Sequence, residues 1–234
     1  MCTLRGPSGW LGRCTHSSRP GGGSLPRMTP ARNRVTPLGA IEAFPLRGAW
    51  TGNRGILHAG TEIVRFHASD LWITCALEFR DRWSEQWRPH HFTWLYFYDE
   101  AVSFAAGHRP CAECRRSSYD AYRSAWADGL AVGVPSAKEM NRQLHAERIV
   151  AGAHRRRLHP MPWAELPAGS FVLLADVPTV VLDAELVEWT RQGYGPVRTR
   201  PVDGVADVIT PPSTVAALRA GYPVQIDSAA ISGP

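Results

Sequence analysis

The feature that most constrains this chain is a pair of cysteines separated by two residues, in the segment Gly107-His108-Arg109-Pro110-Cys111-Ala112-Glu113-Cys114. A Cys-x-x-Cys pair on a turn brings two thiolates to about 3–4 Å from each other, as tetrahedral Zn²⁺ requires. A redox dithiol normally opens a helix after a strand, whereas this pair follows an expected helix. We therefore expect Zn²⁺ as the cofactor, with a redox dithiol or two buried structural cysteines as the alternatives.

Cys75 is the expected third ligand, because two of the five cysteines, Cys2 and Cys14, lie in an N-terminal tail. A fourth ligand from a histidine is preferred over an open position. The candidates are His91, His90 and His145. Three cysteines outside the tail and no apolar centre of a secretory signal argue for a reducing compartment, the cytoplasm. No run approaches the roughly 20 apolar residues that cross a membrane, so no membrane partner is expected.

The composition divides the chain into three parts. Residues 1–27 are rich in Gly, Ser, Pro and Arg and contain no acid, so we expect a disordered tail; Met28 follows directly, as it would if the tail lay upstream of the true start. Prolines at 160, 162 and 167 mark a second boundary. We expect an α+β fold: a zinc-stapled domain over residues 28–159 and a small α+β, strand-containing unit over residues 160–234 packed on it.

Local patterns predict the main elements. Asp99 suits a helix N-cap and Gly107 a helix end, while Ser136 and Glu139 have capping-box spacing. The expected strands cover residues 61–66, 71–79, 92–98, 170–182 and 206–209. The expected helices cover residues 100–107, about 116–126, about 136–151 and 213–220.

The positive charge is concentrated in the middle of the chain. The sequence carries 26 basic and 21 acidic residues; four of these bases lie in the tail. Residues 160–234 carry four arginines and eight acids, which leaves residues 28–159 with a surplus of five positive charges. Such a surplus favours a phosphate-bearing partner, and a solvated arginine-rich surface is the alternative.

The segment from Leu95 to Cys114, LYFYDEAVSFAAGHRPCAEC, resembles the second half of the metal-binding domain of Ada-type DNA repair proteins. The resemblance covers only about residues 70–116. It implies a strand, a short helix and a Cys-x-x-Cys turn that binds zinc on a scaffold that grips the DNA backbone. That family uses four cysteines, one of which accepts a methyl group from a DNA phosphotriester.

This chain departs from the family pattern in the first half of the domain. The stretch from Glu78 to His91, where the family has a cysteine pair, contains no cysteine, and Cys75 falls slightly before the expected place. The resemblance thus implies the zinc scaffold at Cys111 and Cys114 but not the methyl transfer. A histidine, His90 or His91, is a candidate replacement for a lost cysteine.

The leading hypothesis is a zinc-containing nucleic-acid-binding protein that takes part in DNA repair or DNA modification. DNA or another phosphate-bearing nucleic acid is the expected partner. The expected phosphate contacts are Arg109, Arg115, Arg116, Arg142 and Arg148.

Two alternatives stay open, and with them the question of whether the protein is an enzyme. The first is a hydrolase that acts on a phosphoester or an N-glycosidic bond through His58 or His145. The second is a non-enzymatic interaction module in which zinc only holds the fold together.

Overall fold

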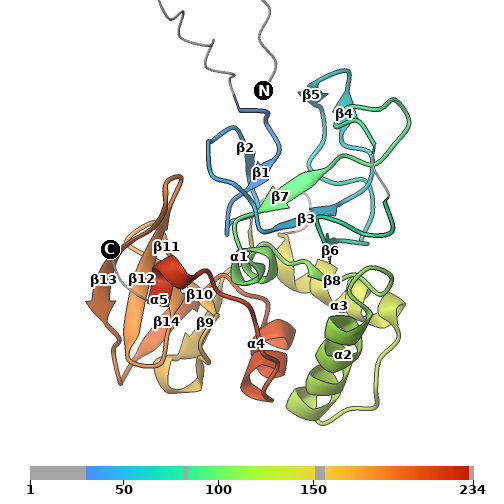
Figure 1. Cartoon of the computed structure of the whole chain (residues 1–234). Coiled ribbons are helices and arrows are strands. Elements are labelled where there is room, and N and C mark those ends of the chain that lie inside the picture. The colour runs from blue at the N-terminus through green and yellow to red at the C-terminus, as the bar shows by residue number, and fades with distance from the viewer. Residues whose placement is uncertain (1–29, 82–83, 151–155, 232–234) are drawn as a thin grey trace, which may run out of the picture.

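Two six-stranded sheets organise the chain, one in each half (Figure 1). The computed structural model describes residues 30–81, 84–150 and 156–231, and the expected tail over residues 1–27 lies outside them. Strands and helices occur together in both halves, so the predicted α+β class is confirmed.

The N-terminal sheet is mixed and has the order β2-β1-β7-β3-β6-β8. Its strands are β1 (Arg34–Val35), β2 (Ile41–Glu42), β3 (Trp50–Asn53), β6 (Ile73–Cys75), β7 (Leu95–Phe97) and β8 (Arg109–Pro110). A separate two-stranded hairpin consists of β4 (His58–Ala59) and β5 (Glu62–Ile63). The pairs β1–β7 and β6–β8 are parallel, and the other pairs of the sheet are antiparallel.

The strands in this half are shorter than expected. The strand predicted over residues 71–79 ends at Cys75, and the chain then turns through Arg80 and Asp81, both in the left-handed backbone region. The strand predicted over residues 61–66 is reduced to β5. No long ladder forms in either segment, and the loop after β6 borders a cavity.

Three helices follow from local signals. α1 (Glu100–Ala105) begins at Asp99, whose side chain accepts a 2.7 Å hydrogen bond from the Val102 N–H, as a capping residue does. α2 (Arg116–Leu130) extends beyond the predicted end and buries Tyr119, Tyr122 and Trp126 on one face. α3 (Ala137–Arg148) has the predicted capping box between Ser136 and Glu139.

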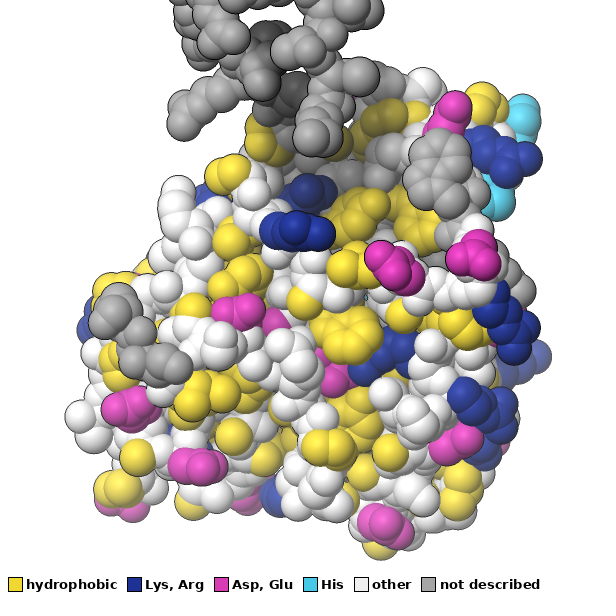
Figure 2. All heavy atoms as spheres, in the orientation of Figure 1, with side chains coloured by type: hydrophobic (Ala, Val, Ile, Leu, Met, Phe, Trp, Pro, Cys, Tyr) yellow, Lys and Arg dark blue, Asp and Glu magenta, His cyan; other side chains and the backbone are white. Residues whose placement is uncertain are grey.

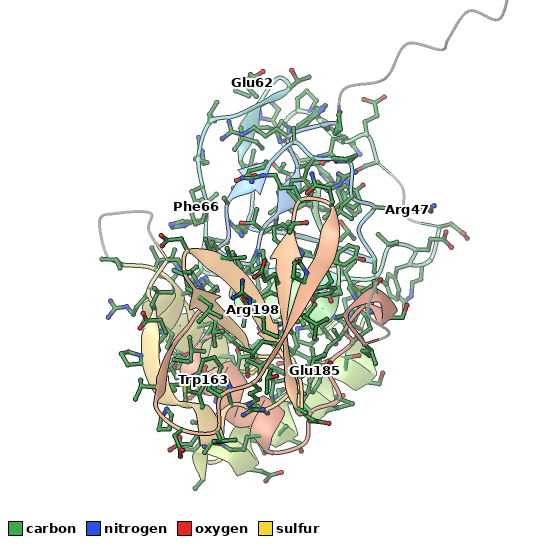
Figure 3. All side chains as sticks on the ribbon, turned by 90° about the vertical axis from the view of Figure 1, so that its left-hand side faces the viewer. Arg47, Glu62, Phe66, Trp163, Glu185 and Arg198 are labelled. Carbon is green, nitrogen blue, oxygen red and sulfur yellow. The ribbon has the colours of Figure 1, made fainter. Side chains whose placement is uncertain are left out.

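The C-terminal sheet is fully antiparallel, with the order β13-β12-β11-β10-β14-β9. Its strands are β9 (His159–Pro162), β10 (Phe171–Leu174), β11 (Val177–Val181), β12 (Glu185–Thr190), β13 (Gly193–Thr199) and β14 (Val205–Val208). Figure 3 shows this sheet toward the viewer, with Arg198 at the front and Glu62 far away in the N-terminal half. The predicted strand 170–182 is thus a hairpin, β10–β11, and sequence patterns missed β9, β12 and β13.

Helix α4 (Pro212–Arg219) and the short α5 (Ser228–Ile231) complete this half; η1 (Trp163–Glu165) is a single 3₁₀ turn. One apolar cluster joins the two halves, because Ala101 and Val102 of α1 pack with Phe171 and Val180 of the C-terminal sheet. Polar contacts add to it: the Gln225 N–H donates to Glu100 (3.1 Å). The helices of the described residues include none that is long and apolar enough to cross a membrane.

Candidate metal centre

Two neighbouring parallel strands bring Cys75 and Cys111 together. Cys75 ends β6, and Cys111 directly follows β8, whose Pro110 is in register with Thr74. The Cys111 N–H continues the ladder by donating to the Thr74 carbonyl at 2.9 Å. Because parallel strands deliver their carboxyl ends to the same edge, Cys75 lies next to the turn that carries Cys111 and Cys114.

The three cysteines form a potential metal-binding group. Their sulfur atoms all lie within 4.8 Å of one another, and none of the three is in a disulfide. Zn–S bonds of about 2.3 Å in a tetrahedron require sulfurs roughly 3.8 Å apart, a spacing that lies within this limit. The three predicted cysteine ligands, Cys75, Cys111 and Cys114, are therefore placed so that they can hold a metal ion together.

The surroundings favour negative charge on the Cys111 sulfur. The Glu113 N–H donates to the Cys111 sulfur at 3.4 Å. Hydrogen bonds from Cys114, then from Cys75, lower the pKa of Cys111. Hydrogen bonds with Cys111, then with Cys114, raise the pKa of Cys75. The trio thus readily gives up one proton, and a bound cation is what would stabilise all three thiolates at once.

A cavity of about 490 Å³ opens beside the trio, and all three cysteines line it. Its walls include the half-buried rings of Phe79, Phe92 and Trp94, which come from the loop between β6 and β7. Trp94 is held in place, because its indole N–H donates to Ser84 at 2.9 Å. Further lining residues are Gly52, Asn53, Ile73, Ala76, Leu77, Asp81, Ser84, Arg88, His91 and Glu113. This volume and lining are typical of a small-molecule site.

The structure brings none of the expected histidines into the metal-binding group formed by the described residues. His91 lines the same cavity, and its ring packs against Phe92 with 4.6 Å between centroids. His90 is exposed and has a positive φ of 60°. His145 lies on α3, where its Nδ1 contacts Arg148 at 3.0 Å. His91 is thus the expected histidine that shares the cavity with the cysteines.

The two histidines proposed for hydrolysis have separate surroundings. His58 is buried, with Nδ1 2.6 Å from the Thr93 hydroxyl and Nε2 3.2 Å from the Arg88 carbonyl. His145 packs instead against His67 and Trp72, and burial, then Arg148, lowers its pKa. Both ring nitrogens of His58 are engaged by Thr93 and Arg88, whereas His145 contacts Arg148, His67 and Trp72, so the geometry does not support an acid/base pair.

Three of the five arginines expected to bind phosphate are buried. Arg109 donates to Asn141 at 2.8 Å, and Arg115 pairs with the buried Glu100. Arg148 is 1% exposed and donates to the carbonyls of Gly107 (2.9 Å) and Asp70 (2.8 Å). These three side chains hold the fold together. Arg116 and Arg142 are exposed, and Arg116 pairs with Asp120 at 2.8 Å.

Sequence patterns missed a group of three arginines, of which Arg54 and Arg148 are buried and Arg156 is half-buried. Arg54 and Arg148 pack against the Trp72 ring at 4.0 and 3.8 Å, and Arg156 reaches the Ile209 carbonyl at 2.6 Å. Among the described residues no salt bridge joins any of these three arginines to an acid, and the remaining residues include no Asp or Glu. Backbone carbonyls and an aromatic face take the place of counter-charges.

Because of this burial, the net charge of the sequence overstates the positive charge on the protein surface. Four arginines and two acids of residues 28–159 are buried, and the exposed and half-buried bases of the described part are nearly matched by acids. Figure 2 shows this mixture, with arginine and lysine side chains interspersed among acidic ones along one edge. The cavity is mixed too, with Asp81 and Glu113 beside Arg88. The charge surplus therefore does not produce a strongly positive surface of the kind that binds phosphates.

No known protein family, curated protein or solved structure matches this chain. The class of site is consequently defined by its geometry alone: three convergent cysteines that can hold a metal ion, at the wall of an aromatic cavity.

Proposed function

We propose that this protein is a zinc-containing protein that binds an unpaired base of a nucleic acid in the cavity beside Cys75, Cys111 and Cys114. The observation that carries the proposal is that the sulfur trio and the aromatic rings of Phe79, Phe92 and Trp94 line one cavity. Zinc is the preferred ion, because Zn²⁺ binds soft thiolate ligands in tetrahedral geometry and has no redox chemistry. Free cysteines at this site fit a reducing, cytoplasmic compartment.

Stacking, rather than phosphate neutralisation, is the main source of affinity in this proposal. Aromatic side chains stack on bases of any sequence, worth about 1–3 kcal/mol per base. Three exposed arginines close to the cavity in sequence, Arg80, Arg88 and Arg116, are available for phosphates. Few such cations are present, so we expect weak salt dependence. Each contact with a single-strand phosphate steepens the fall of log K with log salt concentration by about 0.7.

The resemblance of residues 70–116 to Ada-type zinc-binding domains adds support for a role in DNA repair or modification. The methyl-transfer chemistry of that family is not part of the proposal. The structure gives no support to the hydrolase through His58 and His145, because the two rings have separate partners. An interaction module with structural zinc is the alternative that the following experiment separates.

The test combines metal analysis with binding of a fluorescent single-stranded oligonucleotide. We expect about one zinc per purified chain, lost in Cys111→Ser/Cys114→Ser, and binding of single strands in preference to duplex. Phe79→Ala should weaken binding about tenfold through loss of stacking. Arg198→Ala, on the C-terminal sheet, is the matched control and should leave binding unchanged.

The outcomes separate the two parts of the proposal. A folded chain without zinc would contradict the metal centre. One zinc per chain with no binding of single-stranded or duplex nucleic acid would leave the interaction module as the better account.

A further inference from the structure

The three cysteines all line the cavity, so the group that they form borders open space. Three sulfurs fill three of the four positions of a tetrahedral ion, and the described residues add no fourth ligating atom to the group. We propose that the fourth position of the metal opens into the cavity and takes an exchangeable ligand, a planar heteroaromatic ring with a nitrogen donor. This inference rests on the proposed zinc site and goes beyond it, because structural zinc sites are closed and reactive ones keep an open position.

Two possible protein ligands border the open position without occupying it. His91 packs its ring on Phe92 (4.6 Å), and its backbone N–H donates to the Arg88 carbonyl at 3.2 Å. Glu113 supports the cysteines with its backbone N–H, while its carboxylate is outside the metal-binding group. Both side chains line the cavity, so a ligand bound there would meet one imidazole and one carboxylate at its edge.

The aromatic rings that line the cavity favour a flat ligand. Phe92 and Trp94 lie with 5.0 Å between ring centroids, and Trp94 is fixed at both ends, by Ser84 and by Gln86, whose amide donates to the Trp94 carbonyl at 2.8 Å. A flat ring gains stacking and apolar burial against such walls. A ring nitrogen of a purine or pyrimidine combines this shape with the donor that zinc accepts readily. Zinc bound here would act as a Lewis acid on the ligand.

Cobalt(II) replaces zinc in such sites and makes the coordination visible by absorption. The probes are imidazole and benzimidazole, added to the full chain loaded with Co²⁺. We expect both to shift the visible Co²⁺ bands in a saturable way. Benzimidazole should saturate at about a tenfold lower concentration, because its second ring buries roughly 50 Å² more apolar surface.

Matched variants locate the effect in the cavity. Phe79→Ala should remove most of the advantage of benzimidazole while leaving the imidazole shift and the cobalt content unchanged. His145→Ala, on α3 and outside the cavity lining, is the control and should leave both titrations unchanged.

Two results would overturn the inference. Bands that neither probe alters would show a closed site, and if His91→Ala then made the bands responsive, His91 would be the fourth ligand. If the parent chain bound imidazole and benzimidazole equally tightly, the aromatic rings of the cavity would not contribute to ligand binding. Because a chain that binds no Co²⁺ or Zn²⁺ fails at the first step, failure of the metal centre is distinguishable from failure of this inference.

Discussion

Cys75 and Cys111 become neighbours because one carbonyl joins their strands: Thr74 accepts the Cys111 N–H at 2.9 Å, one step beyond the paired residues Thr74 and Pro110. They are far apart along the chain, so the contact depends on the parallel pairing of β6 with β8. The cysteine group that can hold a metal ion is therefore built into the edge of the N-terminal sheet, and substitution of either cysteine removes a sulfur without removing the ladder.

Cys75→Ser should abolish tight zinc binding, because two remaining thiolates do not complete a structural or reactive zinc site. The measurement is zinc per chain after dialysis against a weak chelator, with circular dichroism to establish folding. The matched control is Cys2→Ser/Cys14→Ser, which removes two cysteines outside the trio. Retention of full zinc in Cys75→Ser would show that Cys75 is a core residue and not a ligand.

Arg148→Lys should lower the free energy of unfolding by about 2 kcal/mol. Lysine keeps the positive charge but loses the planar fork that reaches both the Gly107 and Asp70 carbonyls and stacks on Trp72. Urea denaturation measures the change. Arg142→Lys on the exposed face of the same helix should change stability by less than about 0.5 kcal/mol. Equal effects at both positions would contradict a structural role for the buried cation.

Gly107→Ala should destabilise the protein by more than about 2 kcal/mol. Its φ of +84° disfavours any side chain, and a Cβ there would lie 2.6 Å from the Arg148 Cδ atom. Gly221→Ala is the matched control, because its φ is +93° but nothing lies within 4 Å of the added Cβ. Its cost should be only that of the backbone strain, about 1 kcal/mol. Thermal unfolding of the two variants would separate steric crowding from strain, and a similar loss in both would exclude crowding.

The buried carboxyl of Asp99 should make stability depend on pH. Burial raises its pKa to about 6, although Val102, Tyr194 and Asp227 donate hydrogen bonds to it. The folded state then holds this proton more tightly than the unfolded state, whose carboxyl titrates near 3.9. Stability should consequently fall as pH rises from about 4 to about 6, by up to roughly 3 kcal/mol.

The control for this pH dependence is Asp99→Asn, which retains a capping oxygen but does not titrate. Urea unfolding at several pH values should show a flatter profile between about pH 4 and 6 in Asp99→Asn than in the parent. Parallel profiles of the two proteins would assign the dependence to other groups.

Local signals in the sequence predicted the parts of the fold that depend on residues three or four positions apart. The Asp99 cap, the capping box at Ser136 and the aromatic face of α2 are present as predicted. The same holds for the left-handed Gly107 after α1. These features need only hydrogen bonds and periodicity within one segment, which the neighbouring residues specify. The strand β12 was missed although Val187, Trp189 and Thr190 are typical strand residues. The strand β13 contains Gly193, Gly195 and Pro196, which are depleted in strands, so its pairing with β12 and not its composition makes it a strand.

The sequence by itself determined that Cys111 and Cys114 share a turn and that Cys75 is the remaining candidate thiol. Only the tertiary structure decided that Cys75 reaches them, that the three line an aromatic cavity, and that Arg109, Arg115 and Arg148 lie inside. The physical reason is that solvent exposure and ligand geometry are set by contacts between distant segments. A long cationic side chain is equally compatible with a surface phosphate and with a buried carbonyl until the fold supplies one of them.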